Sequence, residues 1–88
     1  MKAAEEVARI VMDRMRESGF QHAVRIERSE ITRITGVLPA ILIEEIRKEL
    51  AMASLVFAEI PTESFVVAGP ALFAEAPVLT LIQPRRQV

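Results

Sequence analysis

Two helical patterns of apolar residues, separated by a short break, constrain the fold of this chain more than any other feature. They lie in the stretch EITRITGVLPAILIEEIRKEL, from Glu30 to Leu50. Gly36 is expected to end the first helix, because glycine readily takes the left-handed conformation that closes a helix. Pro39 suits the first turn of the second helix, where no backbone donor is needed. The stretch therefore predicts a short helix over Ser29–Gly36 and a longer one over Pro39–Ala53.

The chain before these helices predicts one more helix and one strand. Lys2–Ser18 carries apolar residues at the i, i+3, i+4 spacing of an amphipathic helix. Ala23–Glu27 alternates apolar and polar residues, which favours a short strand with Val24 and Ile26 facing inward. Ser29 follows and is expected to cap the next helix through its hydroxyl. The residues expected on the buried side of that helix are Ile31 and Ile34.

After the long helix, strand and turn signals alternate. Leu55–Ile60 and Phe65–Ala68 are rich in β-branched and aromatic residues, and Pro61–Ser64 between them predicts a turn. The three segments together predict a β-hairpin. Phe57 and Phe65 on its strands either face inward as part of the core or face outward as a contact surface.

Composition limits the class of protein. A chain of 88 residues that is 51% hydrophobic and 26% charged suits one small globular domain. The chain has no cysteine, so disulfides and thiolate sites are excluded and a cytoplasmic location is expected. No apolar run is long enough to span a membrane, so no membrane association is expected. His22 is the only histidine and no serine lies in a nucleophile motif, so we expect no enzymatic activity, metal or cofactor.

In chain order the expected elements are helix, strand, helix, helix, strand and strand. This order resembles the winged helix-turn-helix family, over roughly Val7 to Ala68. The most specific parts are EITRITGV and the long helix that leaves as SLVFAEI, much as the recognition helix of winged domains leads into the first wing strand. The resemblance implies an α+β, winged helix-turn-helix-like domain over residues 1–70, followed by a C-terminal strand-like tail over residues 71–88.

The resemblance leaves two assignments for the buried face of the long helix. Alignment forward from Gly36 makes Leu42 the buried residue. Alignment backward from Leu55 moves the buried positions by one residue. The second alignment is preferred because it gives a continuous helical stripe: Ile43, Ile46, Leu50 and Ala53.

Charge separates this chain from the DNA-binding members that it resembles. In the family, the third helix lies in the major groove and the wing contacts the DNA backbone or minor groove. Between Val37 and Pro70 this chain has Arg47 and Lys48 against five glutamates, a net charge of −3. Basic side chains release counterions from DNA, whereas glutamates facing phosphates oppose binding. The five are Glu44, Glu45, Glu49, Glu59 and Glu63.

Two functions follow as hypotheses. The first is a non-enzymatic regulatory or protein-interaction module whose third helix and wing contact a protein partner. Its candidate contact residues are Leu38, Ile41, Glu44, Glu45 and Lys48. The alternative is a winged helix-turn-helix transcriptional regulator, acting as a dimer on duplex DNA. Its candidate contact residues are Arg25, Arg28, Arg33, Arg47 and Lys48.

Both hypotheses have simpler competitors at the residue level. Leu38, Ile41 and Leu42 either all belong to the core or lie partly exposed beside the glutamates of the long helix. For the basic residues near the short helix, the simpler role is ion pairing with Glu27 and Glu30.

The tail contains an uncharged, strand-like segment, VLTLI. Such a segment either adds an edge to the wing sheet or pairs with a second chain. The candidate dimerisation residues are Val78, Leu79, Leu81 and Ile82.

Overall fold

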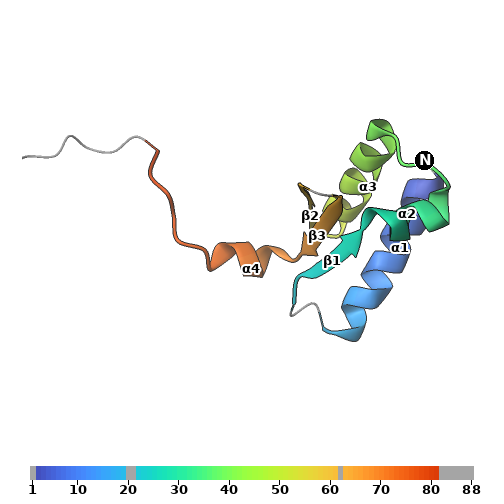
Figure 1. The fold of residues 1–88 in the computed structure, drawn as a ribbon. Coiled ribbons are helices and arrows are strands. Elements are labelled where there is room, and N and C mark those ends of the chain that lie inside the picture. Colours follow the sequence, from blue (N-terminus) through green and yellow to red (C-terminus); the bar gives the residue numbers. More distant parts are fainter. Residues whose placement is uncertain (1, 20–21, 62, 82–88) are drawn as a thin grey trace, which may run out of the picture.

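In the computed structural model, which describes residues 2–19, 22–61 and 63–81, helices cover one face of a small antiparallel sheet (Figure 1). The elements are α1 (Lys2–Glu17), β1 (Val24–Glu27), α2 (Arg28–Thr35), α3 (Ala40–Met52), β2 (Val56–Ile60), β3 (Ser64–Ala68) and α4 (Pro70–Ala74). The described part of the chain is therefore α+β, in the expected element order up to β3, with α4 as an additional short helix. This arrangement is compatible with a winged-helix-like domain.

The sheet has the order β1-β3-β2, with both neighbouring pairs antiparallel. β2 and β3 form the expected hairpin, in which Val56 lies opposite Ala68. On its other side β3 pairs with β1, where Val24 lies opposite Val67. β3 therefore lies in the middle of the sheet, with β1 and β2 at the edges.

The core fills the space between the inner face of the sheet and helices α1 and α3. Phe57 on β2 and Phe65 on β3 stack there, with ring centroids 4.8 Å apart. The inward alternative for these two rings is thus confirmed. The largest fully buried side chains are Phe65, Met15, Ile31, Ile46, Leu50, Val7 and Val67.

The start of α2 differs from the prediction that Ser29 caps it. β1 passes directly into the helix, and Glu27, with an extended backbone, takes the N-cap position. The amide of Arg28 donates a hydrogen bond to the carbonyl of Glu63 in the hairpin turn, at 2.9 Å. This tertiary bond fixes where the helix begins, so Ser29 lies inside it.

The end of α2 agrees with the expectation for Gly36. This residue has a φ of 83° and donates its amide to the carbonyl of Thr32. Only one of the two isoleucines expected to be buried in α2 lies in the core, since Ile31 is buried and Ile34 is 39% exposed. Pro39 stands at the N-cap position of α3, one residue before its predicted place inside the helix.

The buried face of α3 differs from the preferred assignment, which was the stripe that begins at Ile43. Leu42, Ile46 and Leu50 are buried, at the i, i+4 spacing that places them on one face. Ile43 is only half-buried beside them and Ala53 is exposed beyond the helix end. The forward alignment was therefore right at Leu42, and the preferred stripe was right at Ile46 and Leu50 but wrong at Ile43 and Ala53.

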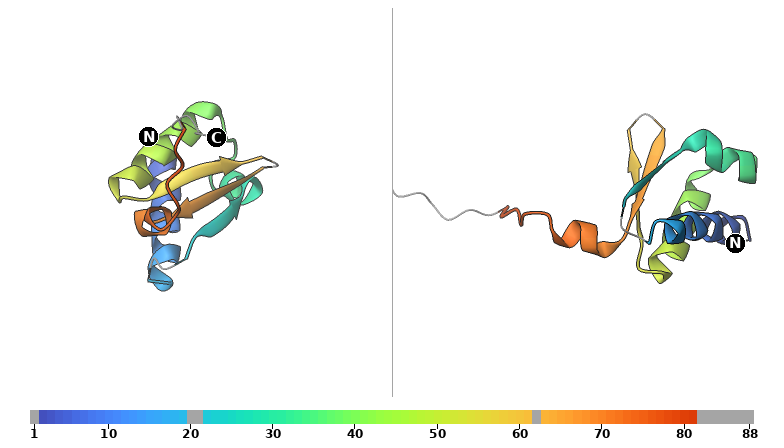
Figure 2. Two further views of the ribbon diagram at one scale, coloured as in Figure 1. Left: turned by 90° about the vertical axis from the view of Figure 1, so that its left-hand side faces the viewer. Right: turned by 90° about the horizontal axis from the view of Figure 1, so that it is seen from below.

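The described part of the tail, up to residue 81, does not form the predicted strand. After α4, residues 75–81 are neither helix nor strand, and Ile82 lies outside the described residues. Figure 1 and the right view of Figure 2 show α4 and the following residues leaving on the side of the sheet opposite α1 and α3. The segment at 78–81 therefore finds no neighbouring strand within its own described chain.

No helix within the described ranges is both long and apolar enough to cross a lipid bilayer.

Candidate functional site

The outer face of α3 is the first surface to consider, because the resemblance makes this helix the recognition helix. Burial of Leu42, Ile46 and Leu50 turns the opposite side of the helix toward solvent. The exposed residues along that side are Ile41, Glu44, Lys48, Ala51 and Met52. The face thus has an apolar residue near each end and charged residues between them.

Both cations of α3 are paired with glutamates of the same helix. Lys48 Nζ lies 3.7 Å from Glu45 Oε1, and the guanidinium of Arg47 pairs with Glu44. Arg47 also donates from Nε to the backbone carbonyl of Phe57, at 3.3 Å. Arg47 therefore links α3 to β2 through its side chain.

The turn between α2 and α3 carries an apolar surface. Val37 is exposed in the turn, Leu38 is half-buried against the core, and Ile41 is 62% exposed in the first turn of α3. We call these three residues the turn patch. The sequence left open whether Leu38, Ile41 and Leu42 all belong to the core. In the structure Leu42 lies in the core, Leu38 at its margin and Ile41 on the surface. Glu44, one helical turn after Ile41, is exposed beside this patch.

The basic residues near α2 are also paired with carboxylates. Arg25 lies 3.8 Å from Glu27, and Arg33 lies 3.4 Å from Glu30, which confirms the expected pairing for these two. Arg25 also donates from Nε to the buried hydroxyl of Ser64, at 3.1 Å.

Arg28 has a partner that sequence reasoning missed. Its guanidinium lies 3.0 Å from a carboxylate oxygen of Glu59 on β2, and 5.4 Å from the centroid of the Phe65 ring. Glu59 lies opposite Phe65 in the sheet register, so the pair spans β2 and the start of α2. Only the register of the sheet reveals this contact, because the two residues are far apart in the sequence.

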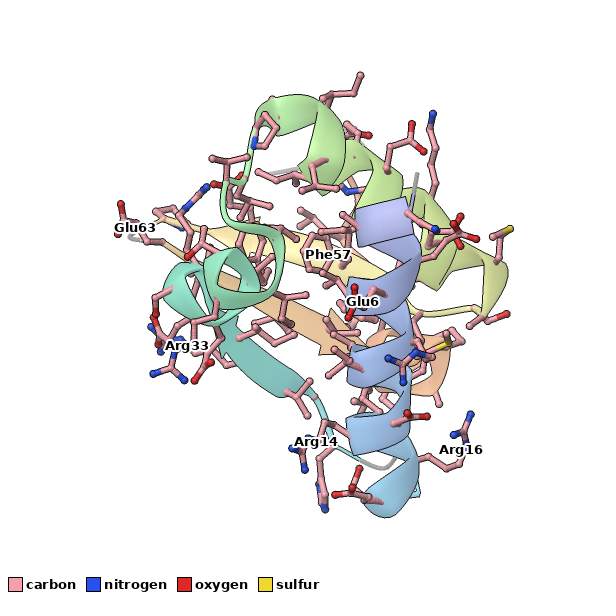
Figure 3. All side chains as sticks on the ribbon, turned by 90° about the vertical axis from the view of Figure 1, so that its right-hand side faces the viewer. Glu6, Arg14, Arg16, Arg33, Phe57 and Glu63 are labelled. Carbon is pink, nitrogen blue, oxygen red and sulfur yellow. The ribbon has the colours of Figure 1, made fainter. Side chains whose placement is uncertain are left out.

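The hairpin that would act as the wing is acidic at its tip. Between Val56 and Ala68 the sequence has two glutamates and no lysine or arginine. Figure 3 shows Glu63 at the tip of the hairpin, pointing outward, and Phe57 inside, between the sheet and α1. The hairpin therefore offers no cation for a phosphate.

A groove with a volume of about 360 Å³ lies between α1, β1 and α2. Half-exposed apolar side chains line it, namely Ile10, Val24, Ile26 and Ile34. The charged residues that border it are Arg14, Arg25 and Glu30. Sequence reasoning missed this groove because its lining comes from three separate elements, and the helical and strand patterns predicted only that Val24, Ile26 and Ile34 face inward.

The candidate dimerisation residues are fully open to solvent where they are described. Val78, Leu79 and Leu81 are 94%, 76% and 86% exposed. Ile82 lies outside the described residues.

Among residues 2–19, 22–61 and 63–81, no three histidine, aspartate or glutamate side chains are placed to hold a metal ion together. Comparison with protein-family models, curated proteins and solved structures gives no match to this chain.

Proposed function

We propose that this chain is a non-enzymatic regulatory module whose α3 and hairpin contact a protein partner. The observation that supports it best is the exposed turn patch, next to a helix face on which each cation lies beside a glutamate of the same helix. Apolar groups surrounded by charged ones are typical of the centre and rim of protein interfaces. Ile41 supplies the apolar contact, and the excess of glutamates over cations on α3 favours a basic partner surface.

Duplex DNA is the second candidate, and two observations favour it. The element order and strand pairing are compatible with a winged-helix-like domain, in which α3 is the DNA-reading element. Arg33 and Lys48 are exposed and held only by surface ion pairs, which are worth little and exchange readily for a phosphate. The charge of −3 between Val37 and Pro70 opposes this role.

The deciding experiment measures protein and DNA binding on the same set of variants. In pulldowns, Ile41→Glu should lose the partner retained by the parent chain, whereas Met52→Glu, outside the turn patch, should weaken retention much less. Met52 is the matched control because it is an exposed apolar residue near the other end of the same helix. Equal retention by both variants contradicts the proposal that the turn patch makes the contact.

In the DNA assay, binding to mixed-sequence duplex should be weak at low salt and vanish near physiological salt. Each phosphate contact costs roughly 0.9 log unit of affinity for each tenfold rise in salt. Residual binding should fall with Arg33→Ala and rise with the double variant Glu44→Ala, Glu45→Ala, which removes repulsion. Tight, sequence-selective binding by the parent at physiological salt would reverse the order of the two candidates.

A further inference from the structure

β1 is an edge strand with an apolar groove beside it. It pairs with β3 on one side, and no described residue pairs with its other side as a strand. An edge strand leaves backbone N–H and C=O groups free to pair with an added strand. Where a side-chain groove runs along such an edge, an extended peptide can pair with the backbone and place alternate side chains in the groove.

The groove selects for an apolar, uncharged occupant. Val24 and Ile26 face it from β1, Ile10 faces it from α1, and Ile34 from α2. Its floor is formed by the buried residues Val7, Val11 and Ile31. Arg14, which Figure 3 shows on the side of α1 next to β1, belongs to the border of the groove with Arg25 and Glu30. A charged peptide would lose hydration in this groove without gaining a buried partner.

The same chain carries an apolar, uncharged segment that suits this groove. Residues Pro77–Leu81, which we call the arm, are uncharged, neither helical nor in a strand, and highly exposed at their apolar positions. α4 carries the arm away from its own sheet on the face opposite α1, so the arm does not reach its own groove in this structure (Figures 1 and 2). Three large apolar side chains on an exposed arm are typical of a segment that is covered by association.

We propose that the arm of one chain adds as a strand to β1 of a second copy and fills the groove there. β1 has four residues, of which Val24 and Ile26 face the groove and Arg25 and Glu27 face away. Because side chains alternate along a strand, Leu79 and Leu81 enter the groove when Thr80 faces away. A two-fold axis allows each chain to give its arm and receive the other, so the contact occurs twice. This inference does not rest on the proposed function.

The test uses two variants and a matched control for each. Leu79→Glu places a charge in the groove and Thr80→Glu places one beside it, on neighbouring residues of the arm. Ile34→Glu alters the groove at a side chain that is already partly exposed, and Met52→Glu makes the same change on α3, outside the groove. In sedimentation, the parent, Thr80→Glu and Met52→Glu should have the mass of a dimer, and Leu79→Glu and Ile34→Glu that of a single chain.

Mixing the two monomeric variants distinguishes a dimer formed by exchanged arms from a dimer formed by another apolar contact. Ile34→Glu keeps an intact arm and Leu79→Glu an intact groove, so the two monomeric variants should form a heterodimer when combined. In that mixture, amide exchange should slow at residues 24–27 of the Leu79→Glu chain. A synthetic peptide of sequence APVLTLIQ should slow the same amides in Leu79→Glu, and the peptide methylated on alternate backbone nitrogens should not.

Four results overturn the proposal. They are a monomeric parent, a dimer that survives Leu79→Glu, a dimer that is lost on Thr80→Glu, and slowed exchange along β2 in place of β1. Circular dichroism checks whether Ile34→Glu is folded. If it is not, the comparison of Leu79→Glu with Thr80→Glu still tests the proposal, because these two changes lie in the arm, outside the core.

Discussion

Leu50 and Lys48 lie two positions apart in α3 but in opposite environments. Leu50 is fully buried in the core, whereas Lys48 is exposed and, among the described residues, pairs only with Glu45. Truncating a buried leucine leaves a cavity, so Leu50→Ala should lower the free energy of unfolding by about 2–5 kcal/mol. Lys48→Ala should change it by less than about 0.5 kcal/mol. Urea denaturation of both variants measures the difference, and equal losses would show that the buried face of α3 is assigned incorrectly.

The arginines of α2 also differ from one another. Arg28 is 29% exposed, pairs with Glu59 and lies against the Phe65 ring, while Arg33 is 78% exposed and pairs with Glu30 of its own helix. Arg28→Ala therefore removes packing, a cation–π contact and a tertiary ion pair, and should cost about 1–2 kcal/mol of unfolding free energy. Arg33→Ala should cost less than about 0.5 kcal/mol. Thermal melts of the two variants at equal concentration check this, and a larger loss for Arg33→Ala contradicts it.

At the scale of the elements, some boundaries are determined by local sequence patterns and others by tertiary contacts. The hairpin and the end of α2 follow from residues within each segment, such as Pro61 and Gly36, so the sequence predicts them. The start of α2 depends on the bond from the Arg28 amide to the Glu63 carbonyl, which no local pattern contains. The buried face of α3 likewise depends on its packing against α1, because Leu42 and Ile43 are equally apolar.

The glycine at the end of α2 gives an element-scale prediction with an internal control. At both Gly36 and Gly69 an added Cβ would meet no atom within 4 Å. Gly36 has a φ of 83° and Gly69 a φ of −76°, so only Gly36 needs the left-handed region. Gly36→Ala should therefore cost about 1 kcal/mol of unfolding free energy. Gly69→Ala should be neutral or slightly stabilising, because alanine restricts the unfolded chain. Urea titrations measure both, and a neutral Gly36→Ala contradicts the conformational argument.

At the scale of the whole molecule, the groove beside β1 and the exposed arm are the features that the sequence could not place. The arm was visible as an uncharged, strand-like segment, and a second chain was one of its two expected partners. The groove needed the packing of α1, β1 and α2, which brings Ile10, Val24 and Ile34 together from distant parts of the sequence. The same holds for the turn patch, since Leu38, Ile41 and Leu42 all fit a helical pattern and only packing distinguishes them.

Removal of residues 76–88 tests the molecule as an assembly. If two chains exchange arms, folding is coupled to association, and the melting temperature of the full chain should rise with protein concentration. The truncated chain keeps every helix and strand of the described structure, so it should stay folded, with the mass of one chain and a melting temperature independent of concentration. Its groove is also free, so the peptide APVLTLIQ should raise that melting temperature, as any ligand that binds only the folded state does. A truncated chain that melts and sediments like the full one would remove the arm from the assembly.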